Sequence, residues 1–312
     1  MIYLIFLFCY VTSYESPEST PLRVLTFNIW NSGQNVEMGE QKIAKHILLL
    51  QPDIVALQEV YVNVTRNLTA MLGHSWTAVD HPNTTYPDTA ILTRHLIIPN
   101  TTIDTDAGLG VKIMLRTGEM IHFWCLHLDY LSYGPYAAFN KLVTNIDQIM
   151  AGENVDNGRG TQILDILNEE KMRIWMNKTE DVPLIVAGDF NGPSHLDWID
   201  DNRNIHGDWS ITWPATKHLE DNGFTDTFRQ IYPSPIIDPG ITWSTVNKYN
   251  PQWNYTIQEP QDRIDFLFYK GPITPVQITT YCGCEPLQRI PYHLKNDYPS
   301  DHFAVYADYN ID

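Results

Sequence analysis

The chain has 312 residues, enough for one large domain or two small ones, and no Pro-rich or Gly/Ser-rich run divides it. Because 43% of its residues are hydrophobic, 12% aromatic and only 18% charged, the composition excludes a largely disordered protein. The formal net charge of −17 opposes long-range attraction to DNA or an anionic membrane, although a bound cation can reverse the local field of a carboxylate cluster. We predict a single domain over residues 21–312.

The first residues, MIYLIFLFCYVTS, form an apolar run followed by small residues. The run from Ile2 to Val11 is too short to span a bilayer as a helix, and no later stretch is long and apolar enough. This pattern predicts a secretory signal peptide over residues 1–13, cleaved after Ser13, with no stable membrane insertion afterwards. An uncleaved anchor is the alternative. We therefore expect a secreted, extracellular protein or one in the lumen of the secretory pathway.

N-linked glycans and cysteine pairing are both open to a secreted chain. Six N-x-S/T sequons are present, at Asn63, Asn67, Asn83, Asn100, Asn177 and Asn254. Removal of Cys9 with the signal would leave Cys125, Cys282 and Cys284, so an oxidising compartment allows one disulfide and one free thiol. The sequence does not choose the pair, and it does not indicate an oligomeric state.

Short β-type runs alternate with helical patterns along the chain, which predicts a mixed α/β protein. Strands are expected at 23–30, 53–60, 75–79, 88–94, 110–116, 120–130, 183–191, 240–246, 263–271, 276–282 and 300–309. Helices are expected at 40–50, 65–72, 162–176 and 216–222. The stretch 192–239, which contains the last of these helices, is rich in Trp, Asp, His and Pro and is predicted to border the site.

Four of the predicted strands end in acid, amide or imidazole side chains: VLTFN, IVALQE, FWCLHLD and LIVAGDFN. In α/β sheets, ligands gather at the carboxyl ends of strands, so these polar ends are expected to converge. Alternation along a strand adds that His127 and Asp129 share one face, and that Asp189 and Asn191 share another. One such residue is more often a turn residue than a catalytic one, but four in one chain favour a shared site.

A cluster of carboxylates needs a counter-charge. Glu59, Asp189, Asp265 and Asp301 would raise one another's pKa at close range unless a cation or a protonated histidine lay among them. We therefore predict a bound metal. Oxygen ligands from acids and amides suit a hard ion, Mg²⁺ first with Mn²⁺ or Ca²⁺ as alternatives, rather than zinc. The choice between one ion and two is left open.

Six short blocks, in order along the chain, resemble the endonuclease/exonuclease/phosphatase superfamily with its DNase I-like fold: TFNIW, LQEV, LHLDY, AGDFN, DRIDF and SDHFAV. The resemblance covers essentially the whole chain after the signal. It implies an α/β protein of the four-layer sandwich type, with two packed mixed β-sheets flanked by helices and the site at one rim. It also implies a metal-dependent phosphoesterase, a hydrolase that acts by in-line attack of water.

The resemblance assigns roles to the matching positions. The principal metal ligand would be Glu59, with Asn28 beside it and Asp301 as a second carboxylate near the ion. Asp189 and Asn191 would position and activate the attacking water and hold the phosphate. These residues would therefore bind the metal, the attacking water and the phosphate.

The histidines complete the implied site. His302 would be the general base or a phosphate-contacting imidazole, with Asp265 orienting it. His127 would contact the phosphate and protonate the leaving oxygen. The apurinic-endonuclease branch lacks this second histidine, so its presence argues against abasic-site repair.

Two segments beside these motifs could select the substrate. Tyr133 and Tyr136, in YLSYGPY, could form a stacking wall for a base or a rim for a lipid headgroup, although tyrosines that only cap the core are the more common case. Ser194 and His195 could contact a phosphate or its leaving group, and an ordinary turn is equally compatible with them. Arg263, inside DRIDF, is expected to pair with a structural acid.

Three functions remain open. A secreted phosphodiesterase or nuclease that acts on nucleic acid or a nucleotide is favoured by the DNase-like GDFN, RIDF and TW pattern, although the chain lacks a basic stripe. A phospholipid (sphingomyelinase-like), inositol-phosphate or phosphomonoester hydrolase is the alternative. A sphingomyelinase would expose an apolar membrane-contacting hairpin, and the sequence shows no convincing one. A catalytically silent binding protein is disfavoured because every family position is filled.

Overall fold

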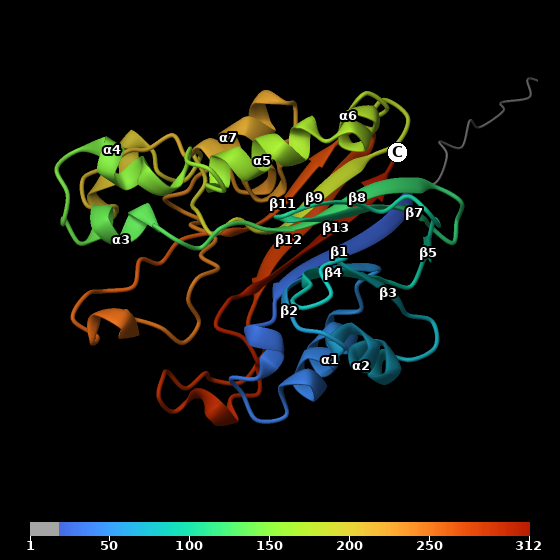
Figure 1. Ribbon diagram of the computed structural model, residues 1–312, viewed down its shortest axis with the longest axis horizontal. Coiled ribbons are helices and arrows are strands. Elements are labelled where there is room, and N and C mark those ends of the chain that lie inside the picture. Colours follow the sequence, from blue (N-terminus) through green and yellow to red (C-terminus); the bar gives the residue numbers. More distant parts are fainter. Residues whose placement is uncertain (1–18) are drawn as a thin grey trace, which may run out of the picture.

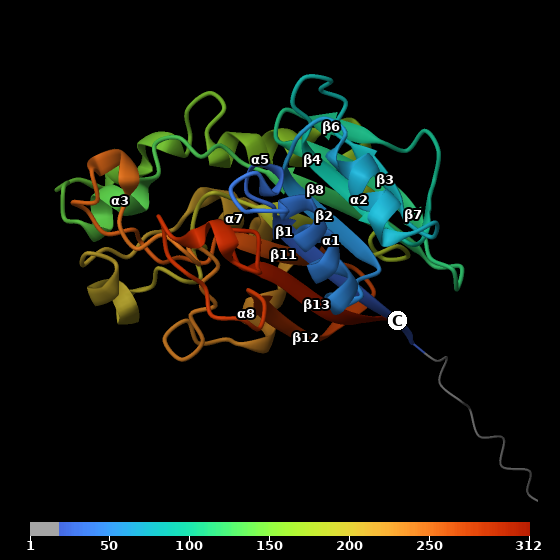
Figure 2. The same ribbon diagram turned by 90° about the horizontal axis from the view of Figure 1, so that it is seen from below.

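The computed structural model describes residues 19–312, and the predicted signal peptide over residues 1–13 lies outside this range. Two mixed β-sheets pack face to face, and helices cover the outer face of each sheet (Figure 1). The predicted four-layer α/β sandwich is therefore confirmed. The C-terminus lies at one end of the sandwich, and α3 (Gly134–Phe139) lies at the opposite end (Figure 2).

The first sheet has six strands in the order β12-β13-β1-β2-β4-β3. Their bounds are β1 (Thr20–Asn28), β2 (Ile54–Val60), β3 (Thr77–Asp80), β4 (Asp88–Thr93), β12 (Ile273–Tyr281) and β13 (Ala304–Ile311). The central strands β1 and β2 run parallel, and β13 and β4 flank them in the antiparallel sense. Because both faces of this sheet are covered, β2 is apolar from Ile54 to Leu57 rather than alternating.

The second sheet has seven strands, in the order β10-β11-β9-β8-β7-β5 with β6 paired to β7. Their bounds are β5 (Leu96–Ile97), β6 (Ile103–Thr105), β7 (Gly108–Met114), β8 (Met120–His127), β9 (Leu184–Asp189), β10 (Thr225–Asp226) and β11 (Asp265–Lys270). Here β8 and β9 run parallel, and β11 runs antiparallel to β9. Each sheet thus has a parallel pair of strands with antiparallel neighbours.

Helices seal the outer faces because their apolar residues recur with helical spacing. α1 (Gly39–Leu50) and α2 (Val64–Leu72) cover the first sheet, and α1 buries Ile43, Ile47 and Leu50 against it. The second sheet is covered by α5 (Arg159–Asn168), α6 (Glu170–Met176) and α7 (Pro214–Asp221). A third apolar layer fills the space between the sheets, where Val24, Ile54 and Phe123 are fully buried.

Several element boundaries differ from the predicted ones. The helix expected at 162–176 is two helices, because Glu169 leaves the helical conformation and caps α6. No strand forms over 240–246, where only Trp243 makes isolated bridges, to Asp262 and His302. The short helices α3, α4 (Ile146–Ile149) and α8 (Thr227–Ile231) are not predicted, because they are too short to show a period.

The surface features expected of a secreted chain can be located in the structure. All six sequon asparagines are exposed. Within residues 19–312, Cys125, Cys282 and Cys284 are all free, and Cys125 is buried between the sheets beside Gln58. Among the helices in this range, none combines the length and the apolar character needed to cross a membrane.

Candidate active site

The polar ends of four strands meet at one edge of the sandwich. The parallel pair β1 and β2 and the parallel pair β8 and β9 end at the same side. They deliver Asn28, Glu59, His127 and Asp189 there, at or next to the ends of the strands. Glu59 lies in a β-bulge opposite β4 and has a φ of 62°, and a bulge is a common way to re-aim one side chain out of a strand.

The antiparallel neighbours of these strands begin at the same edge. Asp88 is the first residue of β4, and Asp265 is the first residue of β11, where it pairs with Asp189 of β9. Asp301 and His302 come just before β13, the antiparallel neighbour of β1. Alternating strand directions therefore collect both carboxyl ends and amino ends of strands at one place.

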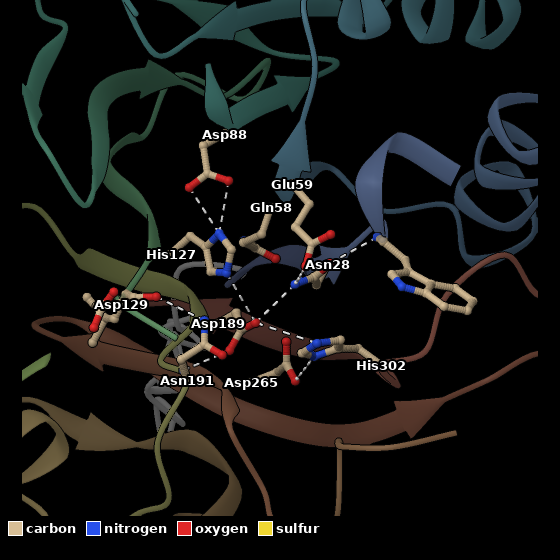
Figure 3. A network of polar contacts seen from close by, with 12 residues as sticks. Asn28, Gln58, Glu59, Asp88, His127, Asp129, Asp189, Asn191, Asp265 and His302 are labelled. Atoms are coloured by element: carbon tan, nitrogen blue, oxygen red, sulfur yellow. Dashed lines mark hydrogen bonds and ion pairs between the residues drawn. The ribbon is translucent and has the colours of Figure 1, made fainter. Parts of the chain in front are cut away.

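One oxygen of Asp189 lies at the centre of the cluster (Figure 3). Its Oδ2 accepts a hydrogen bond from Asn28 Nδ2 at 3.0 Å, and it lies 3.5 Å from His127 Nε2 and 3.7 Å from His302 Nε2. Its Oδ1 accepts a hydrogen bond from the backbone N–H of Asn191 at 2.8 Å. Asp189 is fully buried, so its charge depends on these donors for compensation.

His302 is held by Asp265, as the sequence analysis expected of an orienting carboxylate. Asp265 Oδ2 lies 2.9 Å from His302 Nδ1, and both side chains are buried. Burial opposes the charge on this imidazole, but the carboxylates of Asp265 and Asp189 outweigh it and raise the pKa of His302 well above its ordinary value. The protonated form of His302, which lies between two carboxylates, is therefore favoured.

His127 has a matching partner that the sequence analysis missed. Both carboxylate oxygens of Asp88 lie 3.0 Å from His127 Nδ1. Burial opposes protonation here too, but the charge and hydrogen bond of Asp88 prevail and raise the pKa of His127 to about 10. In the sequence, Asp88 follows Pro87 and directly precedes an apolar run, a position that is usually interpreted as part of a turn. Only the antiparallel pairing of β4 with β2 shows that Asp88 lies at the site.

The predicted metal ligands are adjacent to this network. Asn28 Nδ2 also donates to Glu59 Oε1 at 3.1 Å. Burial, together with the negative charges of Glu59 and Asp189, raises the pKa of Asp301 well above its ordinary value. Within residues 19–312, the Oδ1 atoms of Asp301 and Asp265 are buried without a hydrogen-bond partner. A hard cation would satisfy such oxygens, so the residues fit a divalent ion.

A second grouping of ligand atoms lies in the same cluster. Side-chain atoms of Asp189, Asp265 and His302 all lie within 4.8 Å of one another. In this group, however, His302 already donates to Asp265 and supplies the positive charge. Among the described residues, no hydrogen bond or ion pair joins the carboxylate of Glu59 or Asp301 to an imidazole, so these two carboxylates are the better place for a cation.

Asn191 follows β9 in a left-handed conformation, with a φ of 46°, and its Nδ2 donates to Leu128 O at 2.9 Å. This bond ties the loop after β9 to the loop after β8. The strand β8 ends at His127, so the alternation that would place Asp129 beside it does not continue. Asp129 instead donates its backbone N–H to Gln162 Oε1.

Tyr133 and Tyr136 belong to an aromatic wall, which we define as Tyr133, Tyr136 and Trp243. The hydroxyl of Tyr136 and the indole N–H of Trp243 both donate to Glu259 Oε1. The two tyrosine rings pack edge to face, and the Trp243 ring lies 4.7 Å from that of His302. The wall thus reaches the imidazole at one side of the site.

The tyrosine hydroxyls are occupied, however. Tyr133 donates to Asp262 Oδ2 at 2.9 Å, and Trp198 Nε1 donates to the other oxygen of this carboxylate. Burial raises the pKa of Asp262 to about 6, and these donors limit the rise. Both tyrosines are half-buried, so they offer ring faces rather than hydroxyls to a ligand.

The structure does not bring Ser194 and His195 into the cluster. The Ser194 side chain is fully buried and accepts a hydrogen bond from Leu196 N. His195 contacts α7, where its ring nitrogens lie 2.8 Å from Thr216 Oγ1 and 3.0 Å from Glu220 Oε2. This geometry is that of the ordinary turn considered in the sequence analysis, and we leave both residues out of the substrate contacts.

Arg263 has the structural role expected for it. Its buried guanidinium binds two carboxylates, Asp197 and Asp226, through four hydrogen bonds. A second arginine, Arg229, shares Asp197. This network anchors the segment 192–239 to the start of β11, next to Asp265, and it leaves neither of these two guanidinium groups free to bind a substrate anion.

Two packed mixed sheets with outer helices, and a cluster of acids, amides and imidazoles at one edge, define a phosphoesterase of the DNase I-like class. Residues 25–302 match the sequence model of the Endonuclease/Exonuclease/phosphatase family, and the chain belongs to this family. The protein is therefore a hydrolase of the phosphodiesterase and nuclease type, and enzymes of this family generally use a divalent metal.

The chain is also similar to individual proteins in sequence or in fold. The Caenorhabditis elegans protein F14F9.5 is 70% identical over 302 residues, which cover 97% of this chain and 95% of that protein. C. elegans TDP2 superposes with a TM-score of 0.59 at 18% identity, over 96% of this chain and 78% of that chain. The human Nocturnin catalytic domain with bound sulfate gives 0.56 at 20% identity, over 94% of both chains. At these identities the two structures support the fold alone.

Proposed function

We propose that the protein is a secreted, divalent-metal-dependent phosphodiesterase that hydrolyses a nucleotide or nucleic-acid phosphodiester. The observation that carries the proposal is the convergence of His127 and His302 on one oxygen of Asp189, each with its own carboxylate partner. Two imidazoles on either side of a buried carboxylate suit a reaction in which one oxygen attacks phosphorus and another leaves.

In the proposed mechanism, Asp189 accepts a proton from the attacking water, and the backbone N–H of Asn191 holds the carboxylate in place. The new bond joins the water oxygen to phosphorus, and the bond from phosphorus to the leaving oxygen breaks. His127 gives its proton to that oxygen. Asp265 and Asp189 both favour the protonated form of His302, which suits contact with the phosphoryl oxygens better than the role of a base.

Glu59, Asp301 and Asn28 are the residues proposed to hold the cation, with Mg²⁺ preferred over Mn²⁺ or Ca²⁺. A bound divalent ion would neutralise the charge that develops on the phosphoryl oxygens. Few basic side chains are available to neutralise this charge in place of the ion, since the chain has 20 basic and 37 acidic residues. Loss of the ion should therefore abolish turnover.

Two observations favour a nucleotide substrate. The Trp243 ring of the aromatic wall lies beside His302, and aromatic rings stack on nucleobases of any sequence. TDP2 of D. rerio, solved in complex with a single-strand DNA product, superposes with a TM-score of 0.57 at 18% identity, over 93% of this chain and 99% of that chain. That structure shows a protein of this fold with a DNA strand bound. As part of the proposal, we infer that this chain can bind a DNA strand as well.

A substrate panel tests the proposal directly. Plasmid DNA, RNA, bis-p-nitrophenyl phosphate, p-nitrophenyl phosphate, sphingomyelin and inositol phosphates would each be assayed with Mg²⁺ and with EDTA. We expect EDTA-sensitive release from plasmid DNA, RNA and bis-p-nitrophenyl phosphate, and little from p-nitrophenyl phosphate or sphingomyelin. Turnover of the monoester alone would contradict the proposal, and no turnover of any substrate would favour the catalytically silent alternative.

One feature favours a phospholipid as the second candidate substrate. The loop 249–258, closed by a bridge between Tyr249 and Gln258, exposes Tyr249, Trp253 and Tyr255, each to about half. This aromatic loop was not recognised from the sequence, because its apolar side chains are separated by polar residues. Amphipathic aromatic rings of this kind are suited to a membrane interface.

The aromatic loop also carries the sequon at Asn254, and a glycan there would keep the loop away from a bilayer. The test is hydrolysis of sphingomyelin in vesicles by the wild type and by Trp253→Ala. Under the phospholipid alternative, the variant loses activity on vesicles but not on bis-p-nitrophenyl phosphate. Equal activity of the two proteins on vesicles would remove this alternative.

Secretion is supported by the apolar N-terminal run and by the exposure of all six sequon asparagines. Expression of the full chain in cells with a eukaryotic secretory pathway should release the protein into the medium with Tyr14 as its first residue. Removal of N-glycans should increase its electrophoretic mobility. A protein that stays in the cytosol, with Met1 intact and no mobility change, would contradict this part of the proposal.

A further inference from the structure

The turn after β1 has an unusual backbone. Trp30, Asn31 and Ser32 have φ values of 44°, 52° and 60°, and Gly33 continues at 74°. Residues other than glycine rarely adopt the left-handed region, and three in succession cost free energy that other contacts must offset. Strain of this kind is retained where the surroundings hold the backbone in place, so the contacts of the turn indicate what it does.

Those contacts converge on Glu59. The backbone N–H of Asn31 donates to Glu59 Oε2 at 2.5 Å, and Ser32 Oγ donates to the backbone carbonyl of Glu59 at 2.9 Å. Glu59 is itself left-handed and lies in a β-bulge without a partner across the ladder. Two strained segments, from different strands, therefore stabilise one another at this carboxylate.

Tyr61 closes the arrangement from the other side. Its backbone N–H donates to Ser32 Oγ at 2.7 Å, and its hydroxyl donates to Asn31 Oδ1 at 2.8 Å. Ser32 Oγ thus bonds to the carbonyl of the bulged residue, Glu59, and to the N–H of Tyr61, two residues further along the chain. Ser32 is buried, so water cannot replace these bonds at low cost.

We propose that Ser32 and Tyr61 are positioning residues, which hold the carboxylate of Glu59 in the orientation that binds the divalent cation. This inference rests on the proposed function, since it assumes that Glu59 is a metal ligand. The physical reason is that a glutamate side chain has three rotatable bonds. If its backbone and one of its oxygens are already held in place, most of the conformational entropy has been lost before the metal binds. The outer contacts of metal ligands typically change affinity by about 10–100-fold when lost.

The experiment measures metal binding rather than turnover. Mn²⁺ is titrated into the metal-free protein, and the free ion is counted by electron paramagnetic resonance. We expect Ser32→Ala and Tyr61→Phe to weaken Mn²⁺ binding about tenfold. The matched control is Tyr281→Phe, which loses one hydrogen bond, to His46, in the same sheet but away from the site, and which should bind Mn²⁺ like the wild type.

Ser32→Gly separates positioning from folding. Glycine suits a φ of 60°, so relief of backbone strain should offset part of the stability lost with the two bonds of the hydroxyl. This variant should therefore melt closer to the wild type than Ser32→Ala does, and it should still bind Mn²⁺ more weakly. If the wild type binds Mn²⁺ and Ser32→Gly and Tyr61→Phe bind it equally tightly, the positioning role is overturned and the proposed function stands. If the wild type does not bind Mn²⁺, the metal-dependent function and the positioning role both fail.

Discussion

The pairs His127–Asp88 and His302–Asp265 place the same two chemical groups on opposite sides of Asp189, but in different surroundings. In the first pair the histidine comes from the second sheet and the acid from the first, and in the other pair these origins are reversed. The side chains of His127 and Asp88 are 11% and 26% exposed, whereas those of His302 and Asp265 are 5% and 1% exposed. This difference in exposure is consistent with the proposed mechanism, in which His127 gives its proton to the leaving oxygen and His302 keeps its proton between two carboxylates.

The largest effect is expected from the buried pair. His302→Gln keeps the size and hydrogen-bonding capacity of the side chain but removes the positive charge between Asp189 and Asp265. We expect kcat to fall by about 10²–10⁴-fold on every phosphodiester, whatever its leaving group. Steady-state kinetics, with a thermal melt to show that the variant is folded, measures this. A wild-type kcat in a folded variant would contradict the role of His302.

The pair His127–Asp88, which is the less buried of the two, should respond to the leaving group. His127→Gln should lower kcat by about 10²-fold on a diester that releases an alcohol, because the leaving oxygen then lacks its proton donor. A diester that releases p-nitrophenolate needs little protonation, and its turnover should change much less. Parallel assays of the two substrates test this difference. Equal losses on both would mean that His127 acts on the phosphoryl oxygens, as His302 is proposed to do.

Removing the carboxylate of Asp88, the partner of His127, should shift the pH dependence of kcat. Asp88 raises the pKa of His127 to about 10, and the mechanism uses the protonated imidazole, so wild-type activity should persist until the pH approaches that value. In Asp88→Asn the pKa falls towards the ordinary value of about 6.5, and activity should be lost at correspondingly lower pH. The measurement is kcat against pH for both proteins. An unchanged alkaline limb would show that Asp88 does not control this proton.

The smallest effect is expected at the aromatic wall, beside the buried pair. Tyr136→Ala should raise KM for nucleotide diesters roughly fivefold, near the lower end of the ~1–3 kcal/mol that stacking on a base contributes. Tyr136→Phe keeps the ring and should resemble the wild type. A nucleotide ester and the matching abasic ester are compared, and only the first should respond to the alanine variant. An equal response of both esters would rule out stacking.

Sequence patterns predicted the sheets and many of the site positions for a physical reason. The buried strands read as continuous apolar runs, and the polar residues that end them, such as Asn28 and Asp189, stand out against that background. Asp88 lacked this contrast, because it begins its strand and reaches the site only through the antiparallel pairing of β4 with β2. Recognising it requires the strand order, which single-sequence patterns do not contain.

Contacts between distant residues were the other limit. Tyr133 pairs with Asp262, 129 residues away, and Tyr136 with Glu259, 123 residues away. No local period relates such residues, so the sequence could suggest an aromatic wall but not that its hydroxyls are bound to buried acids. His195 shows the converse case, since its proximity to Asn191 in the chain suggested a substrate contact, whereas in the structure both ring nitrogens contact α7.

The position of β13 has a consequence for biosynthesis. This strand is inserted between β12 and β1, and Asp301 and His302 precede it directly. A nascent chain that has left the ribosome only as far as β12 therefore carries Asn28, Glu59, His127 and Asp189 but lacks the residues that complete the cluster. The edge of β1 that pairs with β13 also stays unpaired until that strand has been made. Assembly of the first sheet and completion of the site are thus one event, which follows the synthesis of β13.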